Sequence, residues 1–269
     1  TAKTDHHRLY FHELGTAQTD DAVIFGDGEG EKYRYVSGYV TEDQQFLVIY
    51  ASNTTSGNRL FIKDLKVPGA ELVVVANDEI SDISIVFSQD GVLFAQTNRS
   101  APNTRLVRFT LDAAQPEQWQ DVIGETENVL NVAVAGGSFF AQYMVDAIAQ
   151  VKQYSTAGEL VREIDLPGPG DAGGFGGKAS DAVTYYSFAN YKTPSTLFRL
   201  DIASGESVVY RESRAPFDSA AYVSEQIFYA SNDGTQVPMI ITHRADLDPN
   251  KAHPTILYGY GGFNVSLTP

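Results

Sequence analysis

The stretch Tyr258-Gly-Tyr-Gly-Gly-Phe263 gathers the residues of this sequence that are best suited to chemistry. A tyrosine hydroxyl keeps its proton at pH 7 and can donate a hydrogen bond. Glycines at positions 259, 261 and 262 allow backbone excursions and close approaches that larger residues would block. Taken alone, the stretch predicts a glycine-rich loop after a core strand, with Tyr258 and Phe263 as packing residues.

The residues expected of a complete hydrolytic site are absent from these 269 residues. No Gly-x-Ser-x-Gly nucleophile elbow occurs, and the nearest similar stretch, Gly136-Gly137-Ser138, continues into two phenylalanines on a predicted strand. The sequence has no cysteine, which excludes disulfides, zinc–thiolate sites and cysteine nucleophiles. A serine nucleophile with its base and acid would therefore have to lie elsewhere.

Other glycine and histidine patterns do not support a cofactor or a metal. Residues 168–173 match a dinucleotide fingerprint, but the following Gly174-Phe175-Gly176-Gly177 cannot begin the helix that this site requires. A phosphate loop fails because Ala179 replaces the required Ser or Thr. His6 and His12 would stand about 20 Å apart on one strand. We therefore expect no cofactor and no metal.

Composition indicates a globular protein without nucleic-acid or membrane partners. The chain is 43% hydrophobic, which is enough for a core, and its net charge of −15 disfavours phosphate backbones and anionic membranes. The longest apolar runs, such as Phe46 to Tyr50, are far shorter than the roughly 20 residues of a membrane span. The sequence leaves cytoplasm and periplasm open. It begins at Thr1 without a leader, and we expect it to be part of a longer protein.

A repeat of short strands runs through most of the chain. Its marker is an apolar second position in strands of similar pattern, found at Leu9, Leu60, Leu106, Val151 and Leu197, with spacings between 45 and 51 residues. A denser apolar run precedes each later strand, at Phe46, Val92, Ser138 and Val183. We expect the dense runs to be covered on both faces and the alternating strands to have one face in water.

This period is typical of a β-propeller with about four strands per blade. A β-sandwich is the alternative, although it requires no such recurrence. The first strand, at Arg8, has no dense run before it, which predicts that the chain opens in the middle of a blade.

The pattern changes near residue 215. Residues 225–230 and 236–243 read as a hairpin around the Asn232-Asp233-Gly234 turn. After Pro254, residues 255–258 are expected to form a third, buried strand. The sequence therefore predicts propeller blades over 1–214 and the beginning of a different domain over 215–269.

These stretches resemble the prolyl oligopeptidase family over essentially the whole chain. The similarity is carried by "NRLFIKDL", "FAQTNRSAPNTRLVRF" and "VYRESRAPFD" in the repeats, and most specifically by "YASNDGTQVPMIITHR" and "PTILYGYGGFNVSLTP". The resemblance implies a seven-bladed propeller that caps an α/β-hydrolase domain. Residues 1–269 would supply the later blades and the first strands of the hydrolase domain.

The resemblance also implies roles for single residues. The tyrosine between the glycines, Tyr260, would donate a hydrogen bond to the oxyanion, and Phe263 would wall the pocket for the substrate proline. Gly259, Gly261 and Gly262 would supply the loop backbone. In the family the catalytic serine, aspartate and histidine follow this segment, so residues 1–269 alone are expected to be inactive.

The implied activity is cleavage of short peptides on the carboxyl side of proline, with the propeller limiting substrate size. The implied partners are such peptides and the remaining parts of the same protein, and the parent is expected to be a soluble monomer. Two alternatives remain open: a related acylaminoacyl- or dipeptidyl-type peptidase, and a propeller that binds a partner protein without chemistry.

Overall fold

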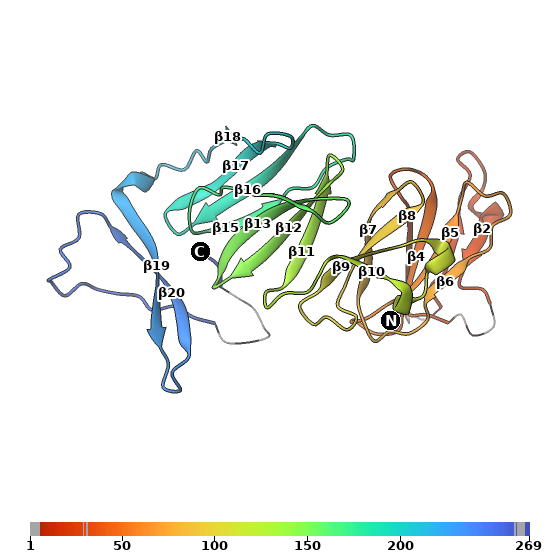
Figure 1. The fold of residues 1–269 in the computed structure, drawn as a ribbon, viewed down its shortest axis with the longest axis horizontal. Helices are drawn as coiled ribbons and strands as arrows, with labels where there is room; N and C mark the ends of the chain where they lie inside the picture. The colour runs from red at the N-terminus through yellow and green to blue at the C-terminus, as the bar shows by residue number, and fades with distance from the viewer. Residues whose placement is uncertain (1–5, 29, 31, 261, 263–266) are drawn as a thin grey trace. The chain divides into compact units, whose positions relative to one another are not determined.

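The computed structural model describes residues 6–28, 30, 32–260, 262 and 267–269. The chain forms two compact units, Thr1–Glu127 and Asn128–Pro269, which are described separately. Figure 1 shows that both are built almost entirely from strands. Within the described residues, no helix has the length and hydrophobicity that crossing a bilayer requires.

The first unit contains a two-stranded and two four-stranded antiparallel sheets. Strand β1 (Leu9–Phe11) pairs with β2 (Ala22–Phe25). The second sheet runs in chain order through β3 (Tyr35–Val40), β4 (Phe46–Ser52), β5 (Arg59–Asp64) and β6 (Val73–Ala76). The third comprises β7 (Ile83–Gln89), β8 (Val92–Thr97), β9 (Arg105–Phe109) and β10 (Gln120–Ile123). Three 3₁₀ turns lie between strands of the same sheet: η1 (Gln18–Asp20) between β1 and β2, and η2 (Leu111–Ala113) and η3 (Pro116–Gln118) between β9 and β10.

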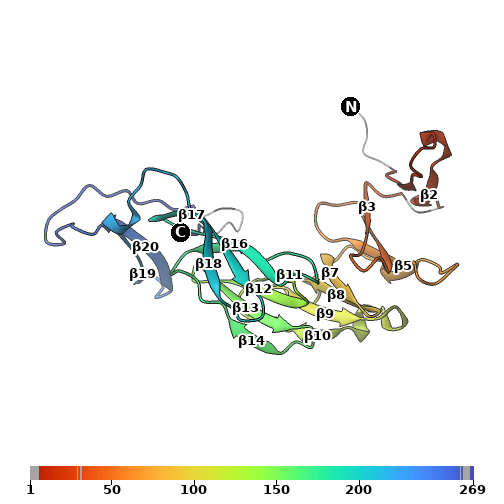
Figure 2. The ribbon, with the colours of Figure 1, turned by 90° about the horizontal axis from the view of Figure 1, so that it is seen from above.

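The second unit repeats the four-stranded sheet twice and adds a hairpin. One sheet comprises β11 (Leu130–Ala135), β12 (Ser138–Val145), β13 (Ile148–Ser155) and β14 (Leu160–Glu163). The other comprises β15 (Asp171–Gly174), β16 (Val183–Asn190), β17 (Thr193–Asp201) and β18 (Ser207–Arg211). After the turn η4 (Ser219–Ala221), β19 (Tyr222–Ala230) and β20 (Gln236–Arg244) form a two-stranded ribbon. Figure 2 shows strands β11 to β14 side by side in one of these sheets.

The predicted repeat is confirmed as a four-stranded antiparallel sheet. Each dense apolar run is the second strand of its sheet, and each alternating strand after it is the third. Since every strand pairs with its neighbour in sequence, the sheets have the simple meander order of propeller blades.

The prediction that the third strands have one face in water is wrong for β5. In β5, three consecutive side chains, Leu60, Phe61 and Ile62, are buried. Leu60 and Ile62 belong to a core shared with β7 to β9, whereas Phe61 packs on the other side against Phe25 and Tyr33. The sheet β3–β6 therefore has a core on each face, and its third strand has no wet side. In β13 the expected alternation holds, with Val151 and Gln153 buried.

The second unit is held together by a ladder of aromatic rings between its two sheets. Phe140, Phe175, Tyr186 and Phe198 stack in order with centroid distances of 5.6, 4.6 and 5.1 Å. The first three are at most 1% exposed. Burial of one such ring stabilises the fold by about 1.5–3 kcal/mol. Packing of β12 against β15 and β16 thus fixes the two sheets as one body.

The predicted hairpin is confirmed, and the predicted third strand is not. Strands β19 and β20 pair in unbroken register from Tyr222 with Arg244 to Ala230 with Gln236, around a turn in which Gly234 has a φ of 87°. Residues 254–260 form no strand, and the Ile256 and Leu257 side chains are 93% and 84% exposed. A strand requires a hydrogen-bonded neighbour, and the described residues supply none for this segment.

Candidate active-site segment

Tyr260 lies in the extended segment that follows the hairpin and is 50% exposed. Its ring lies beside Gly262, two residues later in the chain. A Cβ atom built at Gly262 would lie 3.4 Å from the Tyr260 hydroxyl oxygen and 3.5 Å from the Cζ atom. A Cβ atom at position 262 would therefore make ordinary van der Waals contact with the phenol. The phenol is thus a half-exposed group that can donate a hydrogen bond.

The other residues of the stretch are only partly described. Gly259 has open space around the position of a Cβ atom, so nothing in the described part of the chain requires a glycine there. Gly261 and Phe263 lie outside the described residues. Tyr258 is 75% exposed and does not take the packing role that the isolated sequence suggested.

Two side-chain contacts join the C-terminal segments to the sheets of the same unit. The Gln226 side chain on β19 donates from Nε2 to the backbone carbonyl of Asp146, in the turn between β12 and β13. The Thr268 hydroxyl lies 3.4 Å from the Asp171 carboxylate at the start of β15. Neither contact could be predicted from a local sequence pattern, because each joins residues about 80 to 100 positions apart.

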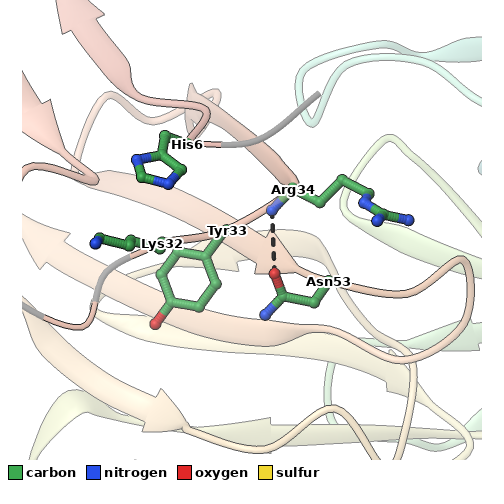
Figure 3. Close-up of a pocket in the computed structure, with 5 residues that line it drawn as sticks. All are labelled: His6, Lys32, Tyr33, Arg34 and Asn53. Atoms are coloured by element: carbon green, nitrogen blue, oxygen red, sulfur yellow. Dashed lines mark hydrogen bonds between the residues drawn. The ribbon is translucent and has the colours of Figure 1, made fainter. Parts of the chain in front are cut away.

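A pocket of about 240 Å³ lies in the first unit, lined by His6, Lys32, Tyr33, Arg34 and Asn53. Figure 3 shows that the Lys32 and Arg34 side chains extend in opposite directions, while the Arg34 amide donates to Asn53 Oδ1 at 3.1 Å. The cationic ends therefore do not converge on one point, and the pocket holds none of the predicted site residues. Among the described residues, no group of three or more ligating side chains could hold a metal ion.

Comparison with known proteins shows which family the repeated sheets match. Residues 1–213 match the family described as the prolyl oligopeptidase N-terminal β-propeller domain. The chain belongs to the prolyl oligopeptidase family. It is 50% identical over 268 residues to the prolyl endopeptidase of Elizabethkingia miricola and 47% identical to that of Elizabethkingia meningoseptica. These alignments cover 99% of this chain and 37% of each relative, so the chain spans little more than a third of their length.

Solved structures of prolyl oligopeptidase family members have the same fold. One, from a study of two prolyl endopeptidases and the role of inter-domain dynamics in catalysis and specificity, has a TM-score of 0.78 at 27% identity, covering 97% of this chain and 38% of its own. Prolyl oligopeptidase B from Galerina marginata has a TM-score of 0.79 at 24% identity, covering 90% of this chain and 35% of its own. The fold is therefore mainly β with a propeller-type domain, as the repeat predicted.

Proposed function

We propose that this chain is part of a serine-type oligopeptidase that hydrolyses short peptides on the carboxyl side of proline. The observation that carries the proposal is an exposed tyrosine in a glycine-rich segment that follows the propeller sheets and one hairpin. The two relatives named prolyl endopeptidase support the proposal, since they are 50% and 47% identical to this chain over 268 residues.

The architecture proposed for the parent is a seven-bladed propeller followed by an α/β-hydrolase domain. Residues 1–214 would form the later blades, and residues 215–269 would form the first strands of the hydrolase domain. The propeller would admit only short peptides to the site. Cytoplasm and periplasm both suit such an enzyme, and we expect it to act as a monomer.

In the proposed reaction, Tyr260 donates its hydroxyl hydrogen bond to the oxyanion formed when the carbonyl carbon of the substrate proline is attacked. A fixed donor aimed at developing charge contributes about 3–4 kcal/mol in comparable sites. Phe263 supplies a flat apolar wall for the pyrrolidine ring. Gly262 lies beside the Tyr260 hydroxyl. Residues 1–269 contain no nucleophile elbow, so this part of the protein alone should not turn over substrate.

The experiment that tests the role of Tyr260 replaces it by phenylalanine in the full-length protein. Because only the oxyanion donor is removed, kcat on a blocked X-Pro reporter should fall by about 10²- to 10³-fold while folding is unchanged. Tyr258→Phe is the matched control, since Tyr258 is an exposed tyrosine two residues away. Unchanged turnover in the Tyr260 variant would remove this residue from the mechanism.

A second assay separates the proposed activity from a dipeptidyl-type peptidase. The full-length protein is given a blocked X-Pro reporter and the same reporter with a free amino terminus. Clear preference for the blocked form supports the oligopeptidase. Preference for the free amine would assign the dipeptidyl type, and lack of turnover of both would favour a propeller that only binds.

A further inference from the structure

We propose that Asn58 locks two neighbouring sheets of the first unit together and thereby limits the size of peptide that the parent protein admits. The sheets are β3–β6 and β7–β10, and the lock is the set of hydrogen bonds that residues of the first sheet make to strand β7. The proposal rests on the role in limiting substrate size that is proposed for the propeller above. Asn58 would determine substrate size without touching the reacting atoms.

Strand β7 is the edge strand of its sheet, with β8 as its partner on one side. The backbone groups on the other side need partners from outside the sheet. Ile83 and Ile85, at alternate positions of β7, are only 1% and 7% exposed, so water has little access to them. The closed edge therefore depends on groups from the neighbouring sheet.

The carboxamide of Asn58, directly before β5, closes this edge at Ile83. Its Oδ1 atom accepts from the Ile83 amide at 2.9 Å, and its Nδ2 atom donates to the Ile83 carbonyl at 3.1 Å. A carboxamide has the same donor and acceptor as a peptide group, so Asn58 pairs with Ile83 as a residue of an adjacent antiparallel strand would. The Asn58 backbone amide also donates to the Ser81 carbonyl at 3.0 Å. One residue of the first sheet is therefore bonded to two positions along the entry to β7.

The next position along the edge is closed by two tyrosines of the same sheet as Asn58. The Ile85 amide donates to the Tyr50 hydroxyl at 2.7 Å, and the Tyr39 hydroxyl donates to the Ile85 carbonyl at 2.8 Å. Both backbone groups of Ile83 and both of Ile85 are thus bonded to one neighbouring sheet. The two sheets can part at this edge only when these bonds break together.

The loop that carries Asn58 also lies directly on the connection between β6 and β7. The Gly57 amide donates to Asp82 Oδ1 at 2.8 Å, and Gly57 has a φ of 75°. A Cβ atom at this position would overlap the Glu79 carbonyl oxygen, so the two backbones are in contact. The loop and the connection therefore meet without a gap beside the bonds of Asn58.

A closed boundary between two sheets bears on substrate size because the blades of a propeller surround a central channel. A peptide that is too large for the channel can pass only when two blades separate. The lock disfavours the separated state, and loss of the bonds to Ile83 raises the population of that state by the factor that corresponds to their free energy. Asn58 therefore sets how often this boundary opens.

Two variants of Asn58 remove the lock in different ways. Asn58→Leu keeps the size of the side chain without its donor and acceptor, and Asn58→Ala removes the carboxamide altogether. Asn98→Leu is the matched control, because Asn98 is also half-buried and its carboxamide also pairs with a residue beside β7. Its bonds to Asp82, of 2.7 and 3.0 Å, link the ends of β8 and β7 within one sheet. The control thus loses similar bonds without removing one between the sheets.

Hydrogen exchange of single amides in the full-length protein tests the lock itself. In both Asn58 variants the Ile83 amide loses its acceptor and should exchange faster for this local reason. The Ile85 amide keeps its bond to Tyr50, so it exchanges faster only if the sheets part. We expect the Ile85 amide to exchange about tenfold faster or more in both Asn58 variants and to be unchanged in Asn98→Leu. Unchanged exchange at Ile85 in both Asn58 variants, or an equal increase in the control, would overturn the lock.

Cleavage of a peptide series by the full-length protein tests the link to substrate size. Each peptide has one internal proline, and the series ends with lengths that the unmodified protein no longer cuts. The measured quantity is kcat/KM for the longest peptide that the unmodified protein still cuts, divided by kcat/KM for a blocked X-Pro reporter. We expect this ratio to rise about tenfold in both Asn58 variants and to be unchanged in Asn98→Leu.

The outcomes separate the lock from the proposed function. The same ratio in all proteins would overturn the role of Asn58 in size selection, even where the Ile85 amide exchanges faster. If the unmodified protein cuts neither the reporter nor any peptide of the series, the proposed function fails, whereas exchange at Ile85 still tests the lock.

Discussion

Replacement of Tyr50 by phenylalanine should destabilise the first unit more than the same replacement at Tyr39. Both hydroxyls bond to the backbone of Ile85, at the point where strand β7 changes register against β8. The Ile85 amide donates to the Tyr50 hydroxyl oxygen at 2.7 Å, and the Tyr39 hydroxyl donates to the Ile85 carbonyl at 2.8 Å. Because β7 is the edge strand of its sheet, the two tyrosines of the neighbouring sheet provide the partners for the Ile85 amide and carbonyl.

The magnitudes follow from what each replacement leaves behind. Ile85 is 7% exposed, so Tyr50→Phe buries an amide without a partner, which costs about 1–3 kcal/mol. Tyr39→Phe removes one bond from a carbonyl, and a carbonyl has a second lone pair, so the expected cost is about 0.5–1.5 kcal/mol. Tyr39 is also 41% exposed, and water can take its place.

The assay is hydrogen exchange of the β7 amides in the full-length protein, which avoids the need for two-state unfolding. A cost of 1–3 kcal/mol corresponds to about 5- to 150-fold faster exchange in β7 for Tyr50→Phe. Strands β16 and β17 serve as the internal control. Equal effects of the two variants, or a larger effect at Tyr39, would refute the reasoning.

Three further predictions concern stability. Burial raises the pKa of Tyr143 to about 12, helped by the nearby Tyr154, so its stabilising contribution is complete below about pH 10 and should be lost as pH rises toward 12. In the Tyr143→Phe protein, the free energy of unfolding should fall less between about pH 10 and pH 12 than in the unmodified protein. The same fall in both proteins would disprove this. Ala147 lies in the turn between β12 and β13 with a φ of 66°, which is unfavourable for alanine. Ala147→Gly should therefore increase the free energy of unfolding by about 0.5–1 kcal/mol and raise the thermal midpoint. A lower midpoint would show that this turn is not strained. Phe140→Ala should cost about 3–5 kcal/mol in chemical denaturation because it opens a cavity in a fully buried ring ladder, and a loss below 1 kcal/mol would mean that the ladder can collapse around it.

The blades could be predicted from sequence because their signal is local and repeated. Each sheet places its densest apolar run second, and that recurrence is visible without any structure. The Asn232-Asp233-Gly234 turn is equally local, and its hairpin was predicted with ends a few residues short. The burial of Phe61 was missed because it depends on Phe25 and Tyr33, which precede its sheet and belong to no repeat.

The candidate site was harder to predict for the same reason. The residue types at 258–263 indicated a special segment, and the family resemblance suggested the role of Tyr260. The apolar run at 255–258 predicted a strand, but strand formation depends on a neighbour that a sequence pattern does not reveal. The contacts of Gln226 and Thr268 join distant parts of the chain, and polar side chains on exposed strands carry no periodic signal.

The measurement that tests the central proposal most directly is product analysis of a peptide with one internal proline, incubated with the full-length protein. We expect the product masses to show a single cut on the carboxyl side of the proline, and we expect the same peptide with alanine in place of proline to stay intact. Removal of two residues from a free amino terminus, a cut at another bond, or no cut at all would contradict the proposed function.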